Sequence, residues 1–233
     1  MITLQIFVNQ KEKHMRAQWG LKRSVKGELV APETMPQKVT APHQADESPT
    51  MQGYVPEIIE VVENSIYFYA DIDREKILKL NKTIISLNNE LTYKGIVTKN
   101  QPAEIYLYIN SHGGSIFDAF SVIDTMLASR LPVNTIIDGV AASAATLISV
   151  VGKRRYIKRH SYFLIHQIST FMFGKYSDFQ DEMENLDKFM KMIKGVYKQY
   201  TGIPMSKLNE ILKHDIYFDA EEALKFGLVD EIL

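Results

Sequence analysis

Cysteine is absent from the 233-residue chain. This absence excludes thiolate metal sites and thiol catalysis, and it is typical of a reducing compartment. The sequence also lacks an H-E-x-x-H pair and a G-x-x-x-x-G-K-[ST] loop, so it contains neither a zincin helix nor an evident nucleotide-binding loop. Ala141 and Ala145 stand where a G-x-S-x-G elbow has glycines, which argues against an α/β-hydrolase. We expect chemistry that uses no metal and no other cofactor.

Long hydrophobic runs and a strong net charge are lacking as well. No run of about 18 apolar residues occurs, so we expect no membrane-spanning helix. The 27 Lys and Arg residues nearly balance the 28 Asp and Glu residues, and the net charge of −1 gives no reason to expect a nucleic-acid partner. The first residues lack a basic flank before their short apolar part, unlike a signal peptide. We therefore predict a cytoplasmic location, with no membrane partner.

Proline is unevenly distributed. Five of the eight prolines lie within residues 31–56. Proline removes a backbone donor and resists helix, so this stretch is predicted to be a linker or an extended arm. Before it, Leu4, Ile6 and Val8 alternate with other residues and suggest one edge strand. We predict an N-terminal extension over residues 1–55, which could be a propeptide or an axial segment, and one folded domain over residues 56–233.

Residues 56–233 alternate between strand and helix patterns, which is typical of an α/β domain. Strands are predicted at residues 65–69, 105–109 and 132–137, and the second is apolar enough to be buried on both faces. Helices are predicted at residues 74–89, from residue 116 onward, at 143–151 and at about 176–200. One face of the second helix is predicted to carry the apolar residues Ile116, Phe117, Phe120, Ile123, Met126 and Leu127.

A serine and a histidine are the most informative pair in the sequence. Ser143 lies among small residues where a strand is predicted to run into a helix, and His166 ends the next apolar run. A serine hydroxyl is a weak nucleophile until a base takes its proton, and small neighbours leave room for a peptide carbonyl. Ser143 alone is also compatible with an ordinary helix start. The pair indicates a serine hydrolase.

Such an enzyme needs an oxyanion hole and an orienting acid. Gly113 and Gly114 follow an apolar strand, where glycine frees the backbone to aim an N–H at a bound oxygen. The N–H of Ala144 would be the second donor. Asp215 precedes a predicted helix start, where it is a candidate acid, although by position alone it is also compatible with a helix cap.

From about Ile66 to Leu233 the chain resembles the proteolytic subunits of the Clp protease family, serine peptidases of the ClpP/crotonase fold. The order of the shared motifs, and nearly all of their spacing, agrees with that family. The motifs are YLYINS at residues 106–111 with Gly113 and Gly114, DTM at 124–126, G-x-AAS at 139–143, IHQ at 165–167, TG at 201–202, AEEA at 220–223 and FGLVD at 226–230.

The resemblance implies roles for the residues singled out above. Ser143 would be the nucleophile, His166 the base and Asp215 the orienting acid of a serine endopeptidase. The backbone N–H groups of Gly114 and Ala144 would hold the oxyanion. The implied chemistry is peptide-bond hydrolysis without a metal ion.

The implied fold consists of repeated β-β-α layers with a projecting handle helix, here residues 176–200. The resemblance also implies that a peptide substrate binds as an added strand. It would lie between the segment with Ser115 and Ile116 and the segment with Gln167 and Ile168, where main-chain hydrogen bonds supply affinity.

The implied partners are copies of the chain itself, an unfoldase ATPase of the Clp type and unfolded polypeptide substrates. The homo-oligomer would be a ring, expected to be heptameric, as a single or a double ring. The ATPase is expected to dock at a set of aromatic residues on two neighbouring strands, namely Tyr67, Tyr69, Tyr106 and Tyr108.

Two alternative functions stay open, and three departures from the family pattern support the first of them. His112 stands where proline is usual, His214 stands where many members have arginine, and residues 169–173 replace a glycine-rich run. One alternative is a non-catalytic ClpP-like ring subunit. The other is a different crotonase-fold acyl-transfer enzyme, which would use an oxyanion hole on thioesters without a triad.

Overall fold

The protein is described from a computed structural model of the chain, over residues 22–23, 29–30, 58–101 and 103–233. The chain divides into two compact units, Met1–Gly53 and Tyr54–Leu233. In the first unit, β1 (Lys22–Arg23) pairs antiparallel with β2 (Leu29–Val30). The strand predicted at Leu4, Ile6 and Val8 lies outside the described residues, and so does the proline-rich stretch at residues 31–56.

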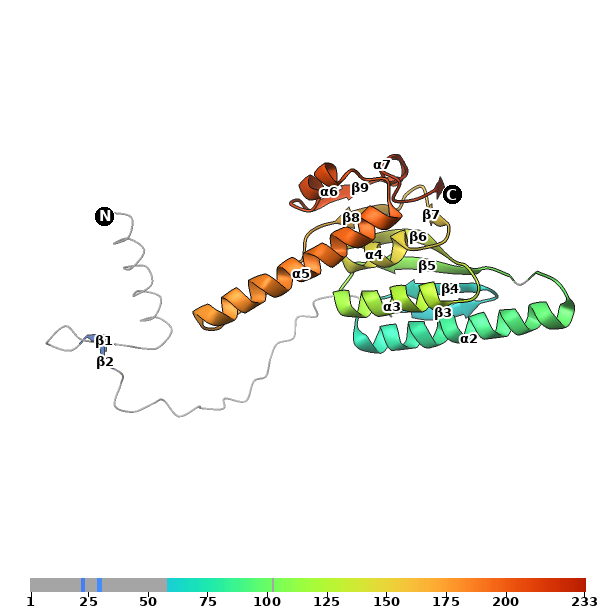
Figure 1. Cartoon of the computed structure of the whole chain (residues 1–233), viewed down its shortest axis with the longest axis horizontal. Coiled ribbons are helices and arrows are strands. Elements are labelled where there is room, and N and C mark those ends of the chain that lie inside the picture. The colour runs from blue at the N-terminus through green and yellow to red at the C-terminus, as the bar shows by residue number, and fades with distance from the viewer. Residues whose placement is uncertain (1–21, 24–28, 31–57, 102) are drawn as a thin grey trace, which may run out of the picture. The chain divides into compact units, whose positions relative to one another are not determined.

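The second unit is built on an eight-stranded mixed sheet (Figure 1). Its strands are β3 (Ile58–Val62), β4 (Ser65–Tyr69), β5 (Ile105–Ser111), β6 (Val133–Ala142), β7 (Arg155–Ile157), β8 (Tyr162–Ile165), β9 (Ile216–Phe218) and β10 (Glu231–Ile232). Six of them follow the order β10-β7-β6-β5-β4-β3, while β8 pairs with β6 and β9. The β3–β4 and β8–β9 pairs are antiparallel and all other pairs in this sheet are parallel.

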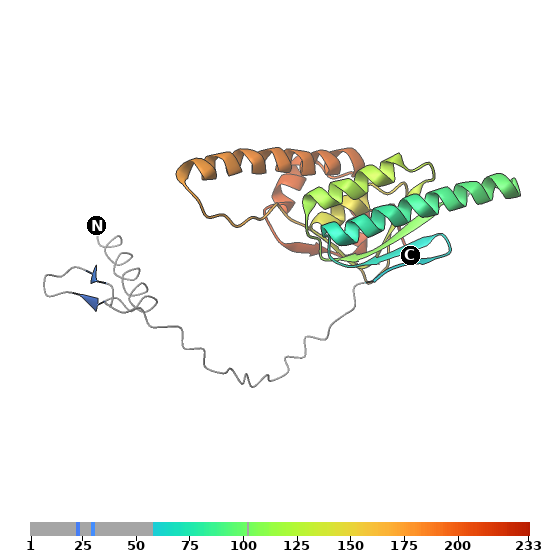
Figure 2. The ribbon, with the colours of Figure 1, turned by 90° about the horizontal axis from the view of Figure 1, so that it is seen from below.

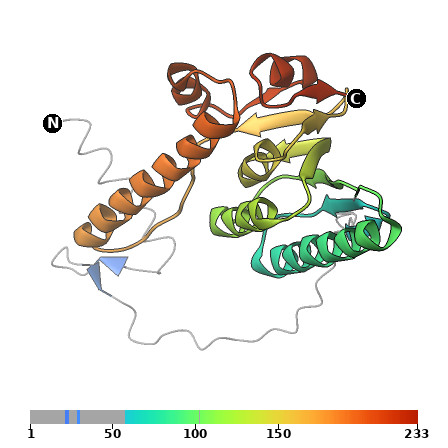
Figure 3. The ribbon, with the colours of Figure 1, turned by 45° about the vertical axis from the view of Figure 1, so that its right-hand side comes forward.

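Helices cover this sheet and extend beyond it. They are α2 (Arg74–Thr98), α3 (Ile116–Ala128), α4 (Ala144–Val150), α5 (Tyr176–Tyr200), α6 (Met205–Ile211) and α7 (Ala220–Lys225). Helices α2 and α3 lie side by side along the sheet (Figure 2). Helix α5 packs against the rest of the unit mainly through its C-terminal half, and its N-terminal end points away from the sheet (Figure 3).

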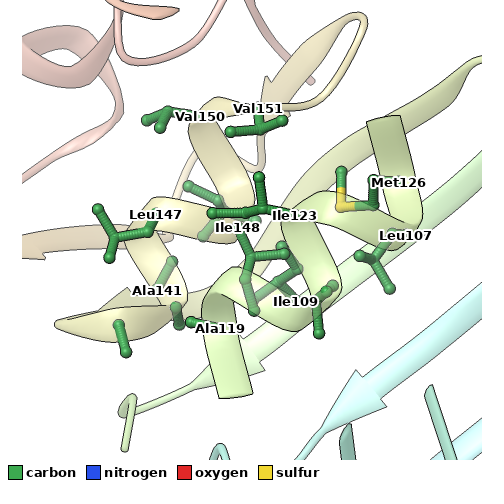
Figure 4. Packing of buried hydrophobic residues seen from close by; sticks show 14 of the residues in the cluster. Leu107, Ile109, Ala119, Ile123, Met126, Ala141, Leu147, Ile148, Val150 and Val151 are labelled. Atoms are coloured by element: carbon green, nitrogen blue, oxygen red, sulfur yellow. The ribbon is translucent and has the colours of Figure 1, made fainter. Parts of the chain in front are cut away.

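The core lies between the helices and one face of the sheet. Figure 4 shows side chains of α3, α4 and β5 gathered in one cluster, with Ile123 and Ile148 near its centre. Ile148 is 1% exposed and Ile109 of β5 is also 1% exposed, so the layer beneath α4 is closed to solvent. This packing fixes α4, and with it the residue that precedes α4, against the sheet.

Strand β6 changes partners along its length. Its first half pairs with β7, and residues Val140–Ala142 pair with β8. Gly139, between the two halves, has φ of +111°, and a Cβ there would stand 2.8 Å from the side-chain nitrogen of Asn110. Glycine is therefore required at this bend. The change of partner separates β6 from β7 and brings its last residues beside β8.

The structure confirms much of the predicted element order and corrects several details. The strand at Ser65–Tyr69 and the long helix Tyr176–Tyr200 are as predicted, whereas α2 continues to Thr98 instead of ending near residue 89. The prediction that residues 105–109 are buried on both faces is wrong, since burial alternates along β5. Phe117 and Leu127, which belong to the predicted apolar face of α3, are 61% and 55% exposed because α3 is covered on one side only.

Candidate active site

Ser143 lies at the junction between β6 and α4. It has φ of +55° and ψ of −125°, and it is the N-cap of α4. A positive φ is uncommon for a residue with a side chain, and it persists only where the surroundings determine it. The N–H of Ser143 donates to the carbonyl of Leu164 in β8, at 2.9 Å. The partner change in β6 thus sets the backbone of this serine.

His166 and Asp215 follow and precede the paired strands β8 and β9. In that antiparallel pair Ile165 lies opposite Ile216, so continuing the register by one step puts His166 opposite Asp215. The distance between Nδ1 of His166 and Oδ1 of Asp215 is 3.6 Å. The side chain of His166 is 25% exposed and that of Asp215 is 79% exposed. Strand pairing therefore brings together two residues far apart in sequence.

Ser143 and His166 line one pocket of about 310 Å³. Helix α5 contributes Glu182, Leu186 and Phe189 to this pocket. The ring of Phe189 meets that of Phe117 edge to face, with 5.1 Å between the centroids. A larger pocket of about 770 Å³ between α2 and α3 contains none of the predicted catalytic residues. We therefore take the smaller pocket as the candidate active site.

The two glycines before α3 approach this junction closely. A Cβ on Gly113 would stand 2.7 Å from both the Ala142 oxygen and the Ser143 Cβ, and 3.1 Å from the Ala144 nitrogen. Gly114 has φ of +141° and forms a bridge with Ile72. Both positions need glycine because a side chain would collide with backbone. The close approach brings the N–H groups of Gly114 and Ala144 into the same region of the molecule.

The N–H of Ala144 occupies the first position of α4. The first N–H groups of a helix have no partner within it and are available to a ligand. On the glycine side, the Gly113 carbonyl accepts from the Ile72 N–H at 2.7 Å, and the Ser115 N–H donates to the Ile72 carbonyl at 2.9 Å. Residue 72 thus holds both flanks of Gly114.

The predicted substrate segments adjoin the same pocket. Ser115, Ile116 and Ile168 line it. Ser115 caps α3 and Ile116 is its first residue, so the extended backbone on this side ends at the cap. On the other side, the Gln167 N–H donates to the Leu212 carbonyl at 3.0 Å. Strand-like binding of a peptide at these residues stays a prediction.

Several residues around the site were not identified from the sequence. Ile72 and the α5 residue Phe189 carry no local motif. Only the fold brings Ile72 beside Gly114 and Phe189 to the pocket. A hydroxyl three residues after Ser143, that of Thr146, was a signal present in the sequence but not used. Among the described residues, no three His, Asp or Glu side chains group as metal ligands. Within the same residues, no helix is long and apolar enough to cross a membrane.

The mixed sheet with alternating helices is consistent with the ClpP/crotonase fold. A model of the Clp protease family matches residues 61–233, and the chain therefore belongs to this family. Members of the family are typically serine peptidases. In general they form oligomeric rings that work with ATPase partners.

Proposed function

We propose that the protein is a serine endopeptidase in which Ser143 is the nucleophile, His166 the general base and Asp215 the orienting acid. The observation that carries the proposal is the backbone of Ser143. A serine at positive φ, at a strand–helix junction, shares a pocket with a histidine that faces a carboxylate. A merely structural serine at a helix start has no need of a strained backbone.

The geometry supports an acyl-enzyme route. An Nδ1–H of His166 directed at Asp215 leaves Nε2 to accept the Ser143 proton. The serine oxygen then bonds to the peptide carbonyl carbon, and the resulting oxyanion is held by the N–H groups of Gly114 and Ala144. The histidine returns the proton to the leaving amine. Water, activated by the same histidine, releases the second product and regenerates the serine.

A fluorophosphonate probe with detection by intact mass tests the nucleophile. The wild-type chain is expected to gain one probe mass, Ser143→Ala none, and the control Ser86→Ala, a change at an exposed serine of α2, one. Hydrolysis of a peptide blocked at both ends then separates an endopeptidase from an exopeptidase. Equal labelling of Ser143→Ala, or an unlabelled wild-type ring, would overturn the proposal, and the second result would favour a non-catalytic ring subunit.

We further propose that the assembled chain receives unfolded polypeptides from a Clp-type unfoldase at a tyrosine cluster formed by Tyr67, Tyr69 and Tyr108. The rings of Tyr67 and Tyr108 stack with 4.6 Å between centroids, and Tyr69 packs edge-on at 6.1 Å from Tyr67. Each half-buried ring leaves apolar area for a partner. Tyr108→Ala is expected to abolish unfoldase-dependent proteolysis and to spare cleavage of short peptides. Loss of both activities, or of neither, would refute this docking role.

A further inference from the structure

The carbonyl of Ser143 is held by a threonine one turn along α4. It accepts from the backbone N–H of Thr146 at 3.0 Å and also from the Thr146 side-chain hydroxyl. The Thr146 oxygen is in turn hydrogen-bonded to the hydroxyl of Tyr197 in α5. Thr146 is 0% exposed and Tyr197 is 2% exposed, so water does not compete for these bonds.

The direction of this chain of hydrogen bonds follows from the groups themselves. A carbonyl oxygen carries no proton, so the Thr146 hydroxyl donates to it. Because the only proton of the Thr146 hydroxyl is used in that bond, the Thr146 oxygen can only accept from Tyr197, and the Tyr197 hydroxyl is the donor. Burial raises the pKa of Tyr197 well above its usual value, and the phenol therefore keeps the proton that it donates. The chain runs from Tyr197 through Thr146 to the Ser143 carbonyl.

The Ser143 carbonyl and the Ala144 N–H belong to one peptide unit. That unit is planar, and in the trans form its C=O and N–H point in opposite directions. Fixing the carbonyl on the side of Tyr197 therefore fixes the direction of the N–H on the other side. Donation to the carbonyl also polarises the unit, because linked hydrogen bonds strengthen one another.

We propose that Thr146 and Tyr197 are positioning residues that anchor the Ser143–Ala144 peptide and so aim the Ala144 N–H at the oxyanion. This inference rests on the proposed function for the role of that N–H. The anchor accounts for the maintained backbone strain at Ser143, since a strained conformation needs a compensating contact. It also makes one side chain of α5 part of the support for catalysis.

Steady-state hydrolysis of a blocked fluorogenic peptide tests the anchor in the full chain. Thr146→Val removes the hydroxyl at nearly constant shape and is expected to lower kcat about tenfold with KM unchanged. This loss is smaller than the ~10²–10³ for complete removal of an oxyanion donor. Thr146→Ser should restore most of kcat, and Tyr197→Phe should give an intermediate loss because Thr146 still donates.

Ser149→Ala is the matched control. Ser149 lies on the same helix, is 0% exposed, and its hydroxyl has no hydrogen-bond partner among the described residues. Its removal should leave kcat unchanged. An equal loss in Ser149→Ala and Thr146→Val would mean that any change in α4 slows the enzyme, and would overturn the proposal. So would a kcat in Thr146→Val that equals the wild-type value.

A crystal structure of Thr146→Val decides the question independently of activity. We expect the Ser143–Ala144 peptide to rotate, so that ψ of residue 143 departs from its value of −125°. An unchanged peptide in that variant would overturn the anchor even if kcat falls. Should the wild-type chain cleave nothing, the proposed function fails, and the crystallographic result still shows whether the two side chains hold this peptide.

Discussion

Gly114 lies so close to Ile72 that a Cβ on it would stand 2.2 Å from the Ile72 carbonyl oxygen. Gly195, in the C-terminal half of α5, is the opposite case, since a Cβ there meets no described atom within 4 Å outside the backbone of its own helix. A side chain would therefore collide with the backbone at Gly114 but would fit at Gly195. Only the first is required by a backbone contact next to the site.

Gly114→Ala is expected to lower the free energy of unfolding by about 2 kcal/mol or more, because the backbone must move and a positive φ is lost. It should also remove peptidase activity. Gly195→Ala is expected to raise the same free energy by about 0.5–1 kcal/mol, because alanine is the better residue within a helix. Denaturant titration of both variants measures the difference, and equal effects would contradict this interpretation of Gly114.

Asp215 gives a second prediction at the residue scale. Asp215→Asn removes the charge that faces His166, so kcat should fall by about 10²–10⁴, with little change in stability because the side chain is exposed. The measurement is kcat on a blocked peptide, with His214→Gln as the neighbouring control. A decrease of less than threefold would show that the acid is supplied elsewhere.

At the scale of elements, one guanidinium joins three of them. Arg155 of β7 donates from Nε to Oδ2 of Asp230 at 3.1 Å and from one terminal nitrogen to the Gly227 carbonyl at 2.9 Å. The same nitrogen also donates to the carbonyl of Tyr200, the last residue of α5. The fork therefore ties β7, the end of α5 and the segment between α7 and β10 to one point.

Arg155→Lys keeps the charge and loses this fork, so the free energy of unfolding should fall by about 1–3 kcal/mol at neutral pH. Arg159→Lys is the control. Its 3.7 Å pair with Glu221 is exposed on both sides and should contribute about 0–1 kcal/mol. Thermal or chemical unfolding of both variants measures the effect. Equal losses in the free energy of unfolding would argue against a stabilising role for the hydrogen bonds of Arg155.

The same contact predicts a pH dependence. Burial acts to raise the pKa of Asp230, but the hydrogen bonds and charge of Arg155 outweigh it, and the pKa is lowered. A carboxyl with a depressed pKa in the folded state stabilises fully above its ordinary pKa and loses this contribution as the pH falls through the folded value. The difference in the free energy of unfolding between wild type and Asp230→Asn should therefore become smaller as the pH falls into the acid range. A difference that grows below pH 4 would contradict this assignment.

Prediction from the sequence succeeded where a pattern is local. The spacing of Ile77, Leu80 and Ile84 predicts a helix, and these residues are buried on α2. Prediction from the sequence failed where an element depends on pairing between strands that are far apart in the sequence. β9 is three residues long, and only its register with β8 reveals it. Ser143 and His166 could be singled out because their neighbours in the sequence form a recognisable pattern. Ile72 and Tyr197 could not, because only the fold brings them near Gly114 and Thr146.

At the scale of the whole molecule, the N-terminal part of α5 is distinguished by exposed apolar side chains. Only Ile193 and Tyr197 of its 25 residues are buried, and both lie near its C-terminal end. Farther out, Met183 is 60% exposed and Phe179 is 46% exposed. Apolar side chains on a projecting helix are typical of a protein–protein contact surface, and because members of the family in general form rings, another copy of the chain is the expected partner.

Met183→Lys is therefore expected to weaken the proposed assembly and to shift its sedimentation to smaller species. Glu184→Gln changes the net charge by the same amount at an adjacent exposed residue and should leave the assembly intact. Analytical ultracentrifugation at matched concentrations compares the two. If both variants sediment as the wild type does, Met183 is not in the contact.

His166 and Asp215 lie across from each other at the ends of paired strands, and this arrangement determines which insertions the chain can accept without separating them. The two residues are 49 positions apart, and α5 and α6 lie between them. Their separation in space depends on the pairing of β8 with β9 and not on the number of intervening residues. Turns added to the outer end of α5 would leave the two side chains aligned, whereas a single residue inserted between Asp215 and β9 would not. Homologous chains can thus differ widely in this region and keep the same pair.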